Sequence, residues 1–209
     1  MLTRLLLFQC CFLLVTGLQL TSSPPLLDMP TYALATFNKD GTTNMNILTY
    51  ATPVSAQPQR VWSLGVYRET LTEENLQRKP GGVLQLLTKD HIDLVSILGG
   101  SSGRDVNKEE ECAKAGFEWI DGEYFDGIQV LPGCASYICF TVQGGMIDAG
   151  SHLIVPYCQV EAMYTTSGDN IQSSDHLRTG RLRELGIITE QGRVASVQRS
   201  LDNRGFRLE

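Results

Sequence analysis

A tight turn between two β-rich runs is the feature that most constrains this 209-residue chain. Asp40-Gly41 is a strong two-residue turn signal. β-forming residues lie on both sides of it, from Tyr32 to Phe37 before the turn and from Thr42 to Tyr50 after it. The pattern predicts a β-hairpin near the start of the folded region.

A further strand and a helix follow the hairpin. Pro53 and Pro58 bracket an expected loop, and the run 61–67 then reads as a strand in which Trp62, Leu64 and Val66 share one face. The next residues predict a helix start, with Thr72 as its hydroxyl cap and acidic residues in its first turn.

The remainder of the chain predicts more strands and a few short helices. Expected strands cover 83–87, 129–131, 135–142 and 153–163, and glycine- and proline-rich turns separate the last three. Expected helices cover 91–98, capped by Asp90, and 107–116, capped by Asn107. This density of turns favours a mainly β fold with peripheral helices, a small barrel with Greek-key-like closure.

Charge excludes one class of partner. The chain has a net charge of -6 and a pI near 5.1, so it lacks the clustered cations that nucleic-acid binding requires. A phosphorylated ligand needs only local positive potential and remains compatible with this composition. His91 and His176 carry no supporting pattern, and we expect both at the surface. Lys108 follows Asn107, and a solvated lysine is the expected role for it.

The first 20 residues resemble a secretory signal segment, because Arg4 precedes an apolar run that is too short for a membrane span. Two alternatives are an organellar leader, plastid targeting included, and a true start at Met29, which would make the protein cytoplasmic. Residues 21–28 read as a linker, residues 29–166 as the folded domain without a membrane span, and residues 167–209 as a C-terminal helix and polar tail. Within that last segment Leu182 and Leu185 are spaced as a helical stripe, and the stretch 192–209 is expected to be frayed or docked on a partner.

Four cysteines lie outside the leader, and none forms a C-x-x-C pair. Scattered buried thiols are the expected state, with pairing possible only in an oxidising compartment. We expect no metal site.

The stretch from Tyr67 to Thr72 has the composition of a phosphate site. Arg68 offers a forked cation, while Thr70 and Thr72 offer hydroxyls at a helix N-terminus, where backbone N–H groups are unpaired.

Two segments, NMNILTYATPVS at 44–55 and YRETLT at 67–72, resemble the flavin reductase-like, FMN-binding split-barrel family. The resemblance extends from about Met29 to about Tyr164 and implies an FMN-binding split β-barrel. It also implies NAD(P)H as co-substrate and a homodimer. The implied flavin-binding residues are Asn44, Met45, Asn46, Ile47, Leu48, Thr49, Tyr50 and Ala51 beside the ring, Tyr67, Arg68, Thr70 and Thr72 towards the phosphate, and Ser101 and Ser102, with Arg104, in a nearby loop.

The same resemblance singles out His152 as the catalytic candidate on the nicotinamide side. Relatives carry Gly-Asp-His where this chain has Gly150-Ser151-His152, so a serine replaces the acid. The alternative is a histidine at a strand start that hydrogen-bonds a turn.

These observations favour an oxidoreductase that transfers hydride from NAD(P)H to flavin. The alternative from another class is a flavin- or small-ligand-binding split barrel without catalysis, since the fold alone does not set the chemistry. A purely structural dimer is the third possibility.

Overall fold

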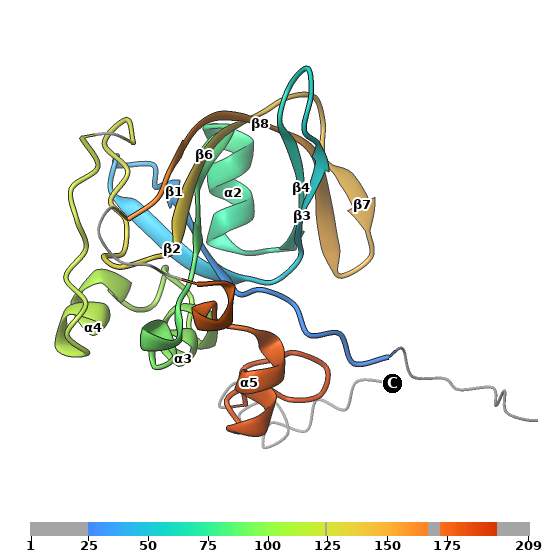
Figure 1. Cartoon of the computed structure of the whole chain (residues 1–209). Coiled ribbons are helices and arrows are strands. Elements are labelled where there is room, and N and C mark those ends of the chain that lie inside the picture. Colours follow the sequence, from blue (N-terminus) through green and yellow to red (C-terminus); the bar gives the residue numbers. More distant parts are fainter. Residues whose placement is uncertain (1–24, 124, 167–171, 196–209) are drawn as a thin grey trace, which may run out of the picture.

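An eight-stranded antiparallel sheet forms the body of the protein, whose computed structural model describes residues 25–123, 125–166 and 172–195 (Figure 1). In the main path of the sheet the strands follow the order β2-β1-β5-β6-β8-β4-β3, and β7 pairs with β8. The strands are β1 (Tyr32–Phe37), β2 (Thr43–Leu48), β3 (Ala51–Ser55), β4 (Val61–Tyr67), β5 (Gly81–Leu86), β6 (Ser136–Val142), β7 (Ile147–Ala149) and β8 (His152–Tyr164).

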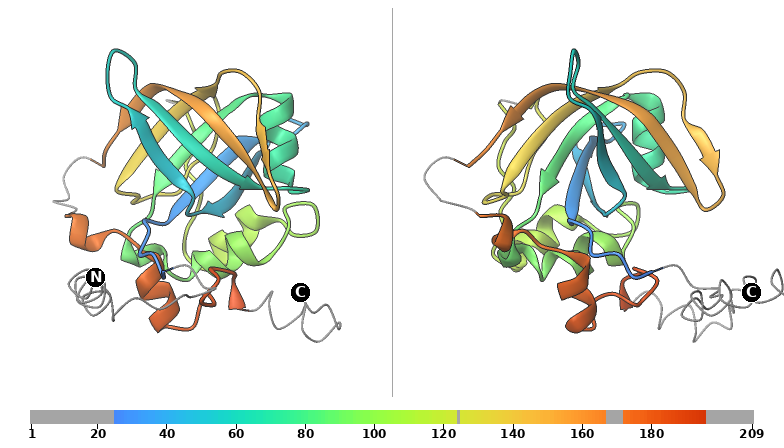
Figure 2. Two further views of the ribbon diagram at one scale, coloured as in Figure 1. Left: turned by 90° about the vertical axis from the view of Figure 1, so that its right-hand side faces the viewer. Right: turned by 45° about the vertical axis from the view of Figure 1, so that its right-hand side comes forward.

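A short connection forces this sheet to curl. β2 and β3 lie at opposite ends of the strand order, yet only Thr49 and Tyr50 separate them in the chain. The three steps from Leu48 to Ala51 span at most about 11 Å, so the two edges must meet at this corner. The Gly65 N–H donates to the Tyr50 carbonyl oxygen at 2.8 Å and fastens the corner to β4. The result is the curled half-barrel in Figure 2, which confirms the predicted split-barrel class.

Helices occupy both sides of the curled sheet. α2 (Leu71–Arg78) buries Leu76 in the barrel interior together with Leu34, Leu64 and Leu84. The opposite side is covered by α3 (Leu94–Gly100), α4 (Lys108–Lys114) and α5 (Thr179–Glu184). Short 3-10 helices cover Lys89–His91 and Ser173–Asp175.

Strand β1 has both faces in apolar surroundings. Tyr32 and Leu34 belong to the core inside the barrel, whereas Ala33 and Ala35 belong to the core beneath the helices. Alternation along the strand sends successive side chains to opposite faces, so β1 separates two hydrophobic cores.

The segment after α5 also belongs to the core. Leu182, Ile188 and Val194 are buried in the same cluster as Leu94 and Leu98 of α3. The expectation of a frayed or partner-docked tail from 192 is therefore wrong for residues 192–195, and residues 196–209 lie outside the described part of the chain. Of the predicted stripe, Leu182 is buried but Leu185 is exposed.

The N-terminal segment runs alongside this C-terminal one. The Asp28 carboxylate accepts hydrogen bonds from Arg178 Nε and the Gly180 N–H, and the Met29 N–H donates to Thr179 Oγ1. Hydrogen bonding from Arg178, together with the charges of Arg178 and Arg183, lowers the pKa of Asp28 despite an opposing effect of burial. Residues from 25 to 28, expected to be linker, thus pack against the C-terminal segment, while the leader lies outside the described residues.

Several local predictions are confirmed and others need correction. The strand at 61–67 and the Asn107 cap are confirmed, since the Asn107 side chain accepts from the Glu110 N–H. The cap of α2 is Thr70, and Thr72 lies inside the helix. The expected loop after Pro53 contains edge strand β3, where a proline without an N–H is tolerated.

Two further elements differ from expectation. The segment 129–131 makes only an isolated bridge, between Val130 and Ile120. The expected helix at 91–98 is divided into a 3-10 turn and α3, so Asp90 does not cap it.

No helix among the described residues is long and apolar enough to cross a membrane. The four described cysteines are all free thiols, three of them buried. The described residues contain no cluster of His, Cys, Asp and Glu suited to a metal ion.

His91 is buried, with 1% of its surface exposed, so its expected surface position is wrong. Its Nδ1 accepts from the Thr88 N–H at 3.2 Å, which leaves the proton on Nε2 to donate to the Pro132 carbonyl oxygen at 2.8 Å. Burial lowers the pKa of His91, and the ring stays neutral at pH 7.

We predict that His91 makes the fold sensitive to acid. In the unfolded chain its imidazole titrates near pH ~6.5, above its pKa in the fold. Stability is therefore complete above that pH and declines as the pH falls from there towards the lower folded pKa, by at most about 1.4 kcal/mol per pH unit. Denaturant unfolding between pH 7 and pH 5 should show a weaker pH dependence for His91→Asn than for the wild type. Equal pH dependence in the two proteins would contradict this assignment.

Candidate functional site

A cavity of about 750 Å³ opens at the corner where β2 turns into β3. This volume lies within the range of roughly 300–1,000 Å³ found for ligand sites. Its walls come from β2, the β2–β3 connection, the start of α2, the loop 99–104, and both terminal segments.

Most of the predicted site residues line this cavity. They are Asn44, Asn46, Ile47, Leu48, Thr49, Tyr50, Tyr67, Thr70, Thr72, Ser101, Ser102 and His152. Three others do not: Met45 and Ala51 are buried in the cores, and Arg68 points elsewhere.

Arg68 belongs to a surface ion pair. Its Nη1 contacts the carboxylate of Asp148 in β7, and both side chains are about half exposed. Tyr67, the preceding residue and the last of β4, lines the cavity, whereas Arg68 begins the turn before α2 and does not line it. Arg68 is therefore directed away from the cavity.

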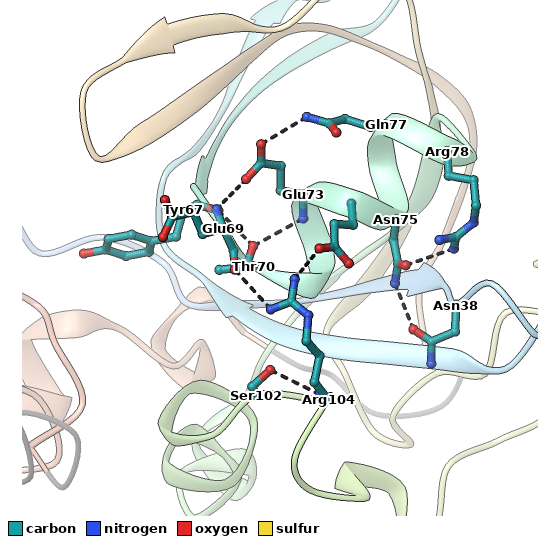
Figure 3. Close-up of polar contacts among 11 residues, drawn as sticks. Asn38, Tyr67, Glu69, Thr70, Glu73, Asn75, Gln77, Arg78, Ser102 and Arg104 are labelled. Carbon is teal, nitrogen blue, oxygen red and sulfur yellow. Dashed lines mark hydrogen bonds and ion pairs between the residues drawn. The ribbon is translucent and has the colours of Figure 1, made fainter.

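Helix α2 begins at the cavity wall. Thr70 Oγ1 donates to the Tyr67 carbonyl oxygen at 2.8 Å and accepts from the Glu73 N–H at 3.2 Å (Figure 3). The first turn of a helix leaves its N–H groups without intrahelical acceptors, which applies here to Leu71 and Thr72. Both residues line the cavity, so this end of it has the properties of an anion site.

Arg104 supplies the cation at this end. Its Nη1 donates to the Glu69 carbonyl oxygen at 3.1 Å and its Nη2 contacts Glu74 Oε1 at 2.6 Å (Figure 3). Glu69 itself has a φ of 61°, a conformation that non-glycine residues seldom adopt. The guanidinium group of Arg104, which comes from another loop, therefore stabilises the turn before α2, and Arg104 also lines the cavity.

The loop that carries Arg104 packs tightly on β2. A Cβ on Gly103 would lie 2.4 Å from Asn44 Oδ1 and 3.2 Å from Leu71 Cδ2. Asn44 is buried and donates to Thr72 Oγ1 at 3.2 Å. Strand β2, helix α2 and this loop thus meet around one amide side chain.

Lys108 is buried at the cavity wall, with 6% of its surface exposed, so its expected solvated position is wrong. Its Nζ donates to the carbonyl oxygens of Met45 at 2.9 Å and Leu98 at 2.6 Å, and no carboxylate among the described residues pairs with it. Burial lowers the pKa of Lys108 to about 8. Its position as the first residue after a helix cap gave no indication of this burial.

His152 lines the cavity within an aromatic cluster. Its ring centroid lies 3.9 Å from that of Tyr67 and 5.2 Å from that of Tyr50. Nδ1 is 2.9 Å from Ser151 Oγ, whereas the buried Nε2 has no hydrogen-bond partner among the described residues. Burial lowers the pKa of His152, which keeps the ring neutral at pH 7.

The charged residues around the cavity are mostly cationic, although the whole chain has a net charge of -6. The cations are Arg104, Lys108, Arg183 and Arg193, and the acids are Glu69 and Glu190. A local excess of positive charge in a concave site attracts anionic ligands.

Sequence comparison agrees with this architecture. The family model described as the flavin reductase like domain matches residues 26–181. The chain belongs to the flavin reductase-like family. No curated protein was found to match the sequence.

Solved structures of the flavin reductase-like family share the fold. Flavoredoxin from Methanosarcina acetivorans superposes with a TM-score of 0.61 at 16% identity, over 78% of this chain and 89% of that one. An FMN-binding protein from Thermus thermophilus, solved with 1-cyclohex-2-enone, superposes with a TM-score of 0.57 at 17% identity, over 85% of this chain and 86% of that one. An NADH:FAD oxidoreductase from Streptomyces globisporus superposes with a TM-score of 0.56 at 13% identity, over 67% of this chain and 77% of that one. At these low sequence identities the structural similarity establishes the fold alone.

We predict that Gly103→Ala will open the junction between the loop and β2. The added methyl group cannot fit beside Asn44, so the free energy of unfolding should fall by about 1–3 kcal/mol, as measured by denaturant titration. Gly145→Ala is the matched control, because a Cβ there would meet nothing within 4 Å. The prediction fails if both variants unfold like the wild type.

Proposed function

We propose that this protein binds FMN and acts as an oxidoreductase of the flavin reductase type, with NAD(P)H as the hydride donor. The supporting observation is that one cavity joins the open N-terminus of α2, a corner rich in main-chain groups, and the buried cation Lys108. Membership of the flavin reductase-like family and the FMN-binding Thermus relative favour the same cofactor.

The residues at the α2 end fit the phosphate of FMN. The amides of Leu71 and Thr72 would donate to phosphate oxygens, as helix N-termini commonly do. The hydroxyl groups of Thr70 and Ser101 already donate to the carbonyl oxygens of Tyr67 and Ile97. Arg104 would provide the charge-assisted contact that the sequence had suggested for Arg68. Both arginines pair with a carboxylate, Arg104 with Glu74 and Arg68 with Asp148, but only Arg104 lines the cavity.

The corner between β2 and β3 would hold the flavin ring system. Residues Asn46 to Tyr50 line the cavity here, and so does Lys108, whose ammonium group donates to the carbonyl oxygens of Met45 and Leu98. A cation in this position would favour the extra negative charge of a reduced flavin. The bound flavin would supply the ring that accepts hydride, while the protein orients the reactants and excludes water.

His152 is the proposed contact on the nicotinamide side. With the Ser151 hydroxyl donating to Nδ1, the imidazole would carry its proton on Nε2 and offer it as a hydrogen-bond donor. The Tyr67 ring beside it, tilted by 38° from the imidazole plane, offers an aromatic surface to a planar ring. Ser151 would orient the imidazole without making it more basic, unlike a carboxylate partner.

The second candidate function is flavin binding without catalysis. The observation that favours it is the neutral Ser151 hydroxyl next to His152, where an acidic partner would help the ring to hold a second proton. The flavin site itself would be unchanged in such a protein.

We also propose a homodimer, built on the face that surrounds the cavity mouth. Tyr50, Tyr67, Ile147 and Ile154 are exposed there, and the pairing of β4 and β7 with β8 places the last three on the same side of the sheet. An exposed apolar patch of this kind is typical of an interface.

We predict that Arg104→Ala will weaken FMN binding at least about tenfold, because a charge-assisted hydrogen bond contributes roughly 1.5–3 kcal/mol. Quenching of FMN fluorescence on titration with the purified protein measures the affinity. Arg68→Ala is the matched control, since it removes an arginine of similar exposure that also pairs with a carboxylate. Weaker binding in Arg68→Ala with normal binding in Arg104→Ala would place the phosphate elsewhere, and no binding by the wild type would refute FMN as the ligand.

We predict that His152→Ala will lower NAD(P)H-dependent flavin reduction by a factor on the order of 10², within the usual contribution of a proton-donating side chain, while FMN affinity is kept. Stopped-flow absorbance of the FMN-loaded protein after mixing with NAD(P)H measures the rate. His176→Ala, outside the cavity, should react like the wild type. An FMN-loaded wild type that NAD(P)H does not reduce would favour the non-catalytic function.

A further inference from the structure

A rigid turn after α5 forms part of the cavity wall. Within the turn the Thr189 N–H donates to the Arg193 carbonyl oxygen at 2.8 Å, and the Gly192 N–H donates to that of Thr189 at 2.9 Å. Ile188 and Val194 flank the turn and are buried in the core. A Cβ on Gly99 would lie 3.1 Å from Val194 Cγ2, so the turn is seated directly on α3.

This turn and α5 bring two arginines to the cavity. Arg193 lines it from the turn, and none of the described residues accepts a hydrogen bond from its guanidinium group. Arg183 lines it from α5, where its Nη1 donates to the Leu27 carbonyl oxygen at 2.9 Å and to Thr179 Oγ1 at 3.2 Å. The Nε of Arg183 is buried and has no hydrogen-bond partner in the described part of the chain. The acids close to them are Glu190 in the same turn and Asp28, and Arg178 pairs with Asp28, so three arginines against two acids leave an excess of one positive charge.

These cations are additional to those that FMN requires. FMN has a single phosphate, and the proposed function assigns it to the start of α2 and to Arg104. Helix α2 lies alongside the strands of the barrel, whereas α5 and the turn lie below the strands (Figures 1 and 2). The two arginines therefore belong to a different wall of the cavity from the FMN phosphate site.

We propose that Arg183 and Arg193 form a second anion subsite, which binds the phosphates of the adenylate half of a dinucleotide. The proposal rests on the proposed function, because the nicotinamide or flavin half must enter the same cavity. Forked guanidinium groups suit phosphate oxygens geometrically. The turn lies beyond residue 181, where the match to the flavin reductase-like family ends, so this subsite is a feature of this chain rather than one carried by the family match.

Two dinucleotides share this chemistry, and the experiment separates them. FMN, FAD, NADP⁺ and ADP are titrated against the purified full-length protein, the last two with FMN already bound, by flavin fluorescence and calorimetry. Arg193→Ala is compared with the wild type, with Arg193→Lys, and with the matched control Arg181→Ala, whose arginine pairs with Glu184 outside the cavity.

We expect Arg193→Ala to weaken ADP binding on the order of tenfold, the effect of one lost charge-assisted contact, with FMN affinity unchanged. Arg193→Lys should recover part of the loss, and Arg181→Ala should bind like the wild type. A matching loss for NADP⁺ identifies the nicotinamide dinucleotide as the occupant, whereas a matching loss for FAD identifies the flavin dinucleotide.

Three results would overturn the proposal: a wild type that binds no ADP, Arg193→Ala that binds ADP as tightly as Arg181→Ala, or Arg193→Ala that loses FMN as well. These results can be told apart from a failure of the proposed function, because FMN binding as a function fails only if the wild type does not bind FMN.

Discussion

The two-residue connection between β2 and β3 is the constraint on which the rest of the structure depends. Because Thr49 and Tyr50 join the opposite edges of the sheet, the sheet cannot stay open and flat. Curling creates an interior that Leu76 of α2 helps to fill, and it leaves a corner where Thr49 and Tyr50 of the connection line a cavity. The fold and the site are thus two consequences of one short loop.

Electrostatics at this corner depend on elements from distant parts of the sequence. Lys108 is held as a buried cation by two carbonyl oxygens, one from β2 and one from α3, rather than by a carboxylate. Burial of an unpaired ammonium is costly, and its persistence next to a cavity is typical of functional sites rather than of structural ones. Arg104, Arg183 and Arg193 approach the same space from other segments. An acidic protein therefore presents a cationic interior site.

Local patterns predicted much of the fold because they report local physics. The strand at 61–67 follows from alternation, and the Asn107 cap from the preference of its side chain for a free helix N–H. The family resemblance likewise placed most of the lining residues, from Asn44 to Tyr50 and at His152. These features can be predicted without knowing which segments pack against them in the folded protein.

The errors arose where a neighbour distant in the chain decides the outcome. Arg68 has the right chemistry for phosphate, but it pairs with Asp148 outside the cavity, while Arg104 reaches the helix start from another loop. His91 and Lys108 look like surface residues until α3, β2 and the segment near Pro132 enclose them. Val194 likewise becomes a core residue only because it meets Gly99.

The sequence by itself determined the β-rich class, the turns, most strand positions and the family, since these depend on propensity, periodicity and short motifs. Only the tertiary structure decided which cation faces the cavity, which polar residues are buried, and that the C-terminal turn forms one of its walls. The physical reason is that burial and charge pairing are properties of contacts between segments. Such contacts exist only after the sheet has curled and brought those segments together.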